Sequence, residues 1–402
     1  MNAKILNILL ALLVYLPTCI FIPLNLYFVV FGIVIYLNFD FLRNYFSNLI
    51  RLKLIDKNFT YILLFSLVAF LLRLIDIESW HSTKDIYSFA YLFPLTYLIA
   101  KTLKGREDIF KYLIYFFIIE MLMSVVEYSM GINTVFSSSR RYRVFEQYDL
   151  LYFTRTFGLS PNSSGLSFKY IFGLILLGIV DFSKTKKIII ETIFIIGSIL
   201  TFGRIALIVL LVFLLLRLFD ELFLRKKVQI IRYLPLTLLI LFFTVNPNWS
   251  VKQFTRGNTI VQNGRINDLD MLEDDKLSDL EKLELTRMLG LDKIDMSGRN
   301  EIWNTFLTYS AKNIHFGNKG KKMLFGKFHA HNSFIELLAS VGIYLFVFMI
   351  FIFARNVTHN NYVFILTILA LAMGQYLIFW GTSFFDIIFY YLLFFYKKNE
   401  DK

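Results

Sequence analysis

The chain is organised around apolar segments of near-bilayer length that contain few charged residues. A helix crosses the hydrocarbon core of a bilayer with about 20 apolar residues. Only helices and closed barrels satisfy the backbone inside lipid. The pattern therefore predicts an all-α polytopic membrane protein with about twelve transmembrane helices. The expected spans are 5–20, 22–38, 59–75, 87–101, 109–130, 164–181, 188–202, 204–223, 229–245, 331–354, 362–380 and 383–396.

Composition agrees with a membrane protein and argues against two other classes. The chain is 57% hydrophobic, whereas soluble domains are about 45–50% apolar. Its net charge of +12 could indicate a nucleic-acid partner, but orientation signals and lipid head groups explain basic charge in a membrane protein. We therefore expect no nucleic-acid partner. The single cysteine, Cys19, excludes an intramolecular disulfide.

Short basic loops predict the orientation of the helices, because such loops remain in the cytoplasm. In a twelve-helix arrangement they all fall on one side, which places both termini in the cytoplasm. The basic residues are Arg43, Arg51, Lys53, Lys57, Lys101, Lys104, Arg106, Lys184, Lys186, Lys187, Arg225, Lys226, Lys227, Lys397, Lys398 and Lys402.

The same arrangement divides the chain into three parts. Residues 1–245 contain helices one to nine, with an outer loop near 131–163. Residues 246–330 form a large outer loop between helices nine and ten, which is periplasmic if the chain is a bacterial inner-membrane protein. Residues 331–402 contain the last three helices and a cytoplasmic tail. Residues 272–290 and 297–313 of the large loop have the pattern of amphipathic helices.

The second of these amphipathic helices has a defined start and a defined apolar face. Ser297 is a suitable N-cap, and Ile302, Phe306 and Tyr309 recur at helical spacing. The loop is therefore expected to cover the membrane domain rather than to fold independently.

Several arginines on the outer side are not explained by orientation. Arg204 lies within apolar sequence, Arg155 precedes the sixth helix, and Arg299 lies in the large loop. A charge at membrane depth costs about 2.5–3.5 kcal/mol on insertion scales and is a functional candidate. Arginine also matches phosphate oxygens geometrically. These residues predict an anionic ligand such as a lipid phosphate.

Each charged candidate also has a structural interpretation. Arg204 could extend to the interface as an anchor, and Arg299 could complement acidic neighbours. Glu120 and Glu127 share one face of the fifth helix and could pair with Arg73 on the third. The cluster of three arginines after the fifth helix has the pattern of a solvated turn: Arg140, Arg141 and Arg143.

Two histidines precede the tenth helix in the sequence "HAHNSFIELLASVG". His331 could accept a proton from a sugar hydroxyl near neutral pH, although a histidine there could equally be an interfacial residue. His329 is interpreted as a loop residue. The two histidines, with His315 farther along the loop, lack the ligand spacing of a metal site, so no metal is expected.

The spacing His331–Asn332, nine residues, then Gly342 resembles the signature of the O-antigen ligase and polymerase superfamily of bacterial envelopes. Leu345 stands where a second glycine usually follows. Further segments that resemble the superfamily carry Gly298, Arg299, Ile302 and Trp303; the turn Phe316 to Gly320; Gly203 and Arg204; and Arg155, Gly158, Pro161 and Asn162.

The resemblance implies a glycosyltransferase that uses a glycan on undecaprenyl pyrophosphate, without a metal or other cofactor. It implies that Arg204, Arg299 and Arg155 hold the pyrophosphate and that His331 is the general base. Three further residues are expected to contact the acceptor or glycan: Asn332, Trp303 and Asn162.

Three functions remain open on the sequence. The favoured one is an O-antigen or capsule repeat-unit polymerase, with a chain-length regulator and a flippase as possible partners. The second is the ligase that transfers the glycan to lipid A-core. The third, a lipid-linked glycan transporter, predicts a duplicated half, and no such repeat occurs in the sequence.

Overall fold

The structure, a computed structural model, describes residues 3–19, 26–51, 53, 55–74, 92–136, 142, 144, 155–201, 203–224, 299–323, 329–379 and 383–396. Within these residues the fold is helical and contains no β-strand, apart from one isolated bridge between Ile132 and Val144. The all-α fold class is therefore confirmed for the described part of the chain.

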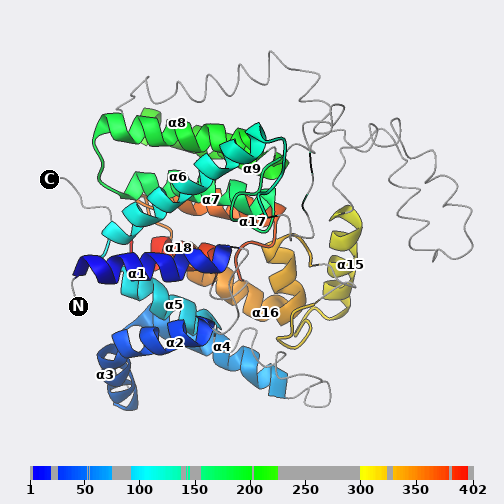
Figure 1. The fold of residues 1–402 in the computed structure, drawn as a ribbon. Helices are drawn as coiled ribbons and strands as arrows, with labels where there is room; N and C mark the ends of the chain where they lie inside the picture. The colour runs from blue at the N-terminus through cyan, green and yellow to red at the C-terminus, as the bar shows by residue number, and fades with distance from the viewer. Residues whose placement is uncertain are drawn as a thin grey trace, which may run out of the picture.

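The helices form a bundle (Figure 1). They are α1 (Ala3–Tyr15), α2 (Leu26–Leu37), α3 (Phe39–Ile50), α4 (Lys57–Leu74), α5 (Leu92–Leu103), α6 (Asp108–Ser129), α7 (Ser163–Ile179), α8 (Lys184–Leu200), α9 (Arg204–Phe219), α15 (Arg299–Lys312), α16 (Ser333–Asn356), α17 (Tyr362–Gly374) and α18 (Phe384–Phe394), with short turns of 3₁₀-helix at Leu16–Thr18 and of π-helix at Asp220–Leu224.

The predicted spans correspond closely to these helices. Every span outside 229–245, which lies beyond the described residues, overlaps a helix of the structure, although some differ from it by several residues at one end. Three of them, α4, α6 and α16, are long and apolar enough to cross a membrane, and several others are apolar but shorter. The chain therefore has helices of membrane-spanning type, while the total of about twelve stays a prediction.

Two helices form the centre of the bundle. Nearly every residue of α7 and α18 is buried, as expected for helices that are apolar on all faces. Helix α18 packs on α5, α7 packs on α8, and α17 packs on α9. The first and last helices, α1 and α18, are in contact (Figure 1).

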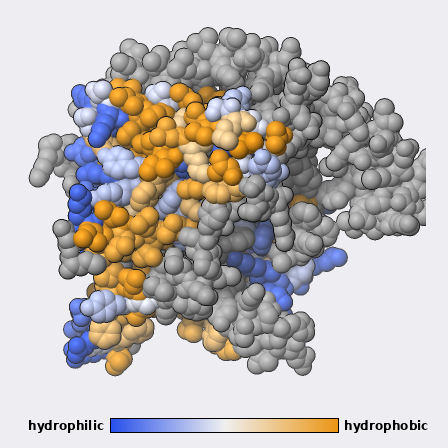
Figure 2. Space-filling model, viewed as in Figure 1, coloured by the Kyte–Doolittle hydropathy of each residue, from blue (hydrophilic) through white to orange (hydrophobic). Residues whose placement is uncertain are grey.

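The outer helices present apolar side chains to the surroundings instead of polar ones. Figure 2 shows these side chains gathered over α6, α8 and α9. A soluble monomer rarely exposes contiguous apolar surface larger than a few hundred Å², so such faces fit contact with lipid. The exposed residues recur at helical spacing: Leu64, Leu67 and Leu71 in α4; Ile119, Leu122 and Val126 in α6; Ile208, Leu211 and Leu215 in α9; and Tyr344, Val347 and Phe351 in α16.

Helix α3 was not predicted and corrects the interpretation of its segment as a simple basic loop. Tyr45 is buried, whereas Phe46 and Ile50 are exposed beside Arg43. A helix with one exposed apolar stripe and basic residues is typical of a membrane interface. Its polar residues interrupt the apolar windows by which spans were recognised, which is why it was missed.

Candidate functional site

The starts of α7, α9 and α16 and the end of α17 lie at one end of the bundle. A Cβ placed on Gly203, just before α9, would lie 3.1 Å from the hydroxyl of Ser167 in the second turn of α7. A Cβ on Gly374, the last residue of α17, would lie 2.9 Å from a methyl carbon of Ile205. These contacts bring the start of α9 against α7 and against the end of α17, so segments of the middle and last thirds of the chain meet.

The start of α16 is interlocked with the connection between α17 and α18. The hydroxyl of Ser333 donates to the carbonyl of Gln375 at 3.2 Å and accepts the N–H groups of Leu377 at 2.9 Å and Ile378 at 3.1 Å. Asp386, in the first turn of α18, accepts the N–H of Phe379 at 2.6 Å. These hydrogen bonds fix the start of α16 against the connection between α17 and α18.

His331 lies directly before α16 in an unusual backbone conformation. Its φ is 49°, in the left-handed region, which few non-glycine residues adopt outside turns and functional sites. Its neighbour Asn332 caps α16: the side-chain oxygen accepts the N–H groups of Phe334 at 2.9 Å and Ile335 at 3.1 Å. The predicted glycan-binding residue Asn332 is thus seen in a structural role through its amide oxygen.

The backbone between the two histidines is held from two sides. The indole N–H of Trp303 in α15 donates to the carbonyl of Ala330 at 2.6 Å. The N–H of Ala330 donates to a carboxylate oxygen of Glu336 at 2.9 Å. Trp303, predicted to contact the glycan, therefore positions the histidine segment. The predicted apolar face of α15 is confirmed, since Ile302 and Phe306 are buried in one cluster with Ala330.

Glu336 is the buried acidic group of this site. Its side chain is 0% exposed, and its second oxygen, Oε1, lies 3.8 Å from Nδ1 of His329. The His329 side chain is 29% exposed, and its ring centre lies 5.2 Å from that of Tyr376. His329, interpreted from the sequence as a loop residue, is therefore part of the site.

Lys322 is a cation in this region that the sequence analysis did not single out. Burial lowers the pKa of its ammonium group, while the carboxylates of Asp386 and Glu336 act in the opposite direction. The ammonium nitrogen lies 5.4 Å from the ring centre of Tyr376. Its position seven residues before His329 is not visible as a pattern in the sequence, because the run Lys319, Lys321, Lys322 looks like a solvated turn.

Gly342 marks a break in α16. Its φ is 75° and its ψ is 177°, which interrupts the helix. A Cβ there would lie 2.3 Å from the carbonyl oxygen of His315, and one on Gly317 would lie 2.6 Å from the backbone nitrogen of Gly342. The motif turn Phe316 to Gly320 thus packs directly on the motif glycine. Backbone bonds fix the contact, including Asn318 N–H to the Ala339 carbonyl at 2.8 Å.

Asn162 and Arg155 lie at the start of α7. The side-chain oxygen of Asn162 caps this helix by accepting the N–H of Gly165 at 2.7 Å, so this predicted glycan-binding residue also has a structural role. Arg155 is half-buried seven residues earlier. The segment between them is attached to α6, because Glu127 accepts the N–H of Gly158 at 2.8 Å.

The sequence suggested that Glu120 and Glu127 pair with Arg73. In the structure Glu120 forms its ion pair with Lys169 instead. The ammonium of Lys169 in α7 lies 2.9 Å from both oxygens of Glu120, and both side chains are buried. Tyr15 at 2.8 Å and Ser160 at 2.8 Å also donate to Glu120. The structural interpretation of Glu120 is therefore supported, with Lys169 rather than Arg73 as its shown cation.

Some predicted groups lie outside what the structure describes. Arg204 begins α9 and Arg299 begins α15, but their side chains are among those not described, so their pyrophosphate-binding role stays a prediction. Three other predicted features also lie outside the described residues: the cluster Arg140, Arg141 and Arg143, the N-cap Ser297, and the rest of residues 225–298. Among the described residues, no group of three or more histidine, cysteine, aspartate or glutamate side chains is arranged to hold a metal ion.

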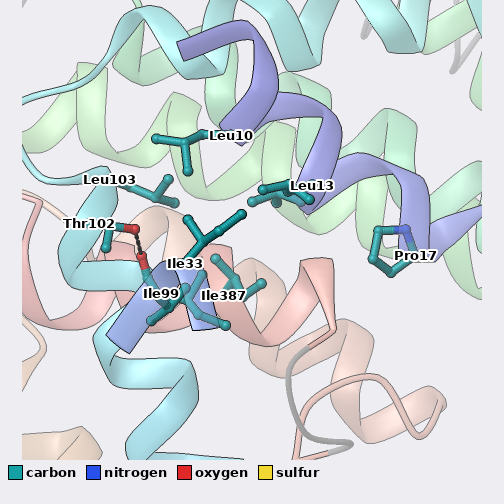
Figure 3. Close-up of a pocket in the computed structure, with 10 residues that line it drawn as sticks. Leu10, Leu13, Pro17, Ile33, Ile99, Thr102, Leu103 and Ile387 are labelled. Carbon is teal, nitrogen blue, oxygen red and sulfur yellow. Dashed lines mark hydrogen bonds between the residues drawn. The ribbon is translucent and has the colours of Figure 1, made fainter. Parts of the chain in front are cut away.

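An apolar crevice lies elsewhere, between α1, α2, α5 and α18. Figure 3 shows Leu10 and Leu13 of α1 facing Ile33, Ile99 and Ile387. Its only hydroxyl, from Thr102, is bonded to the carbonyl of Ile99 at 2.6 Å. With no titratable lining residue, the crevice offers no group for proton transfer, so the end of the bundle at α16 is the candidate site.

Comparison with known proteins adds no relative to this description. No protein-family model, no curated protein and no solved structure matches the chain. The resemblance to the O-antigen ligase and polymerase superfamily therefore depends on the motif residues alone.

Proposed function

We propose that the chain is an O-antigen or capsule repeat-unit polymerase. It transfers a glycan from undecaprenyl pyrophosphate to another lipid-linked repeat unit at the periplasmic face of the inner membrane. One observation carries the proposal: three successive motif segments between residues 299 and 342, at Trp303, at Gly317 and at His331, meet at the start of the broken helix α16 and at its break.

The proposed reaction needs few groups from the protein. An acceptor hydroxyl attacks the anomeric carbon, its oxygen forms the new glycosidic bond, and the bond to the pyrophosphate oxygen breaks with inversion. The leaving pyrophosphate keeps the bonding electron pair, and the hydroxyl proton passes to a histidine. Arginine side chains that neutralise the developing charge would accelerate the step. Arg204, Arg299 and Arg155 are the proposed cations, and His331 is the base that the motif implies.

The proposed topology has about twelve spans, both termini in the cytoplasm and residues 246–330 in the periplasm. A cysteine at position 278, in a Cys19→Ser background, tests it with an impermeant thiol reagent applied to intact spheroplasts. Labelling before lysis is expected. Labelling only after lysis would overturn both the orientation and the proposed site of transfer.

The function is tested by the surface glycan of a strain that lacks this chain. A polymerase deletion leaves one repeat unit on the lipid A-core. A bare core with polymer still on the lipid carrier would identify the ligase instead, and lipid-linked units that never reach the periplasm would identify a transporter. Complementation with His331→Ala is expected to leave the defect, whereas His359→Gln, at the far end of α16, is expected to restore the ladder.

A further inference from the structure

Glu336 is a carboxylate placed to act on a neighbouring side chain. It is fully buried on the first turn of α16. One oxygen, Oε2, accepts the N–H of Ala330, which fixes the direction of the carboxylate. The other, Oε1, is buried and accepts no hydrogen bond from the residues that the structure describes. A buried carboxylate oxygen is costly unless a donor or a charge satisfies it.

The imidazole of His329 lies beside that oxygen. Its Nδ1 lies 3.8 Å from Oε1, and its side chain is partly exposed while Glu336 is not. A carboxylate beside Nδ1 favours the tautomer with hydrogen on Nδ1, which leaves Nε2 as the proton acceptor. It also stabilises the imidazolium that forms after proton transfer. The pair has the order of groups of a general base and its orienting carboxylate, at a separation about 1 Å longer than a hydrogen bond.

His331 has a different environment. Its backbone is held in the left-handed region at φ 49°, directly before the cap of α16. The strain of such a conformation is of order 1–3 kcal/mol and is typical of functional sites. This backbone conformation is what the structure shows to be distinctive at His331.

We propose that His329, oriented by Glu336, accepts the proton of the acceptor hydroxyl, and that His331 positions the substrate. The inference rests on the proposed function. The acceptor O–H proton moves to Nε2 of His329 while the acceptor oxygen bonds to the anomeric carbon. The pyrophosphate leaves with the electron pair of its broken bond, and the imidazolium later returns its proton to solvent.

Other titratable and charged groups face this pair and enter its pH dependence. Lys322 comes from the turn before the histidines, Tyr376 from the connection after α17, and Asp386 from α18. The ammonium of Lys322 opposes a second positive charge nearby, whereas the carboxylates favour it. Variants of Glu336 therefore test the orienting role more cleanly than variants of Lys322.

The experiment measures polymerisation by purified full-length protein with lipid-linked repeat units between about pH 5 and 9, the range in which histidine titrates. His329→Gln is expected to lower the rate by about 10²–10⁴-fold and to remove the acidic limb of the pH–rate profile. Glu336→Gln is expected to lower the maximal rate, because the imidazole loses the carboxylate that orients it. The double variant should be no slower than His329→Gln alone, since the two residues act as one unit.

The matched control is His331→Asn, because asparagine tolerates the left-handed backbone. It should retain the acidic limb, although its KM rises. If His331→Asn removes the limb and His329→Gln keeps it, the assignment is wrong and His331 is the base. If wild-type protein makes no polymer from these substrates, the proposed function fails instead. Equal melting temperatures of the variants separate either result from misfolding.

Discussion

The replacement Glu120→Gln tests whether the buried ion pair attaches the outer segment of α7 to α6. In the structure Glu120 is 0% and Lys169 is 1% exposed, and the ammonium contacts both carboxylate oxygens at 2.9 Å. Glutamine leaves the ammonium buried without its anion. Removing one partner of a buried pair costs about 3–5 kcal/mol. The loss is sharpened because the carboxylate also accepts from Tyr15 and from the N–H of Leu159.

The assay is equilibrium unfolding of the detergent-solubilised protein, followed by circular dichroism. Lys111→Met is the matched control, because Lys111 lies on the same α6 and pairs with Asp108 at 2.8 Å in an exposed position. An exposed pair contributes about 0–1 kcal/mol, so this variant should unfold nearly as the parent does. Adding Lys169→Met to Glu120→Gln should recover part of the stability, because it removes the uncompensated charge.

The result that would refute this reasoning is a Glu120→Gln protein as stable as Lys111→Met. In that case Lys169 would find an equivalent anion or water after the change, and the pair would not hold the start of α7. A single variant as stable as the double variant would contradict the charge-based explanation in the same way.

Three further predictions address the site. Gly342→Ala should destabilise the protein by about 1–3 kcal/mol or prevent folding, because its Cβ would lie 2.3 Å from the His315 carbonyl oxygen; thermal unfolding checks this. Trp303→Phe keeps the ring but loses the bond to Ala330, so it should cost about 0.5–1.5 kcal/mol and lower polymer yield at normal protein level. Arg204→Lys should restore polymer poorly compared with the parent, because lysine lacks the forked geometry; full activity of Arg204→Ala would reduce that residue to an interface anchor.

The helices were predictable because membrane spans depend on a property visible in the sequence, namely a long apolar run. The predicted spans 109–130 and 164–181 differ by a few residues at most from α6 (Asp108–Ser129) and α7 (Ser163–Ile179). Helix α3 was not recognised, because it has one apolar face along the helix and no continuous run of apolar residues.

The site was predictable only in part. Its motif residues could be found from spacing, but the groups that complete it come from tertiary contacts. Lys169 is a charged residue inside an apolar span, and such a residue is expected to pair with an opposite charge. Its pairing with Glu120 depends on how α6 and α7 pack. Glu336 looked like an ordinary first-turn acid, and nothing in the sequence showed that it would be buried beside His329.

The spacing of nine residues between Asn332 and Gly342 has a geometric meaning in the fold. Asn332 caps α16 and Gly342 breaks it, so the nine residues from Ser333 to Val341 form a half-helix. At about 1.5 Å per residue it is about 13.5 Å long, a little under half of a hydrocarbon core of about 30 Å. The turn at Gly317 satisfies the backbone at the break, as required where a helix is interrupted at membrane depth. The number of residues between the cap and the break determines how far the helix start is rotated and displaced relative to Gly342. It therefore also determines the direction in which Glu336 points. The nine-residue spacing in the sequence motif is therefore also the length of a half-helix, and the first turn of this half-helix lies at the site.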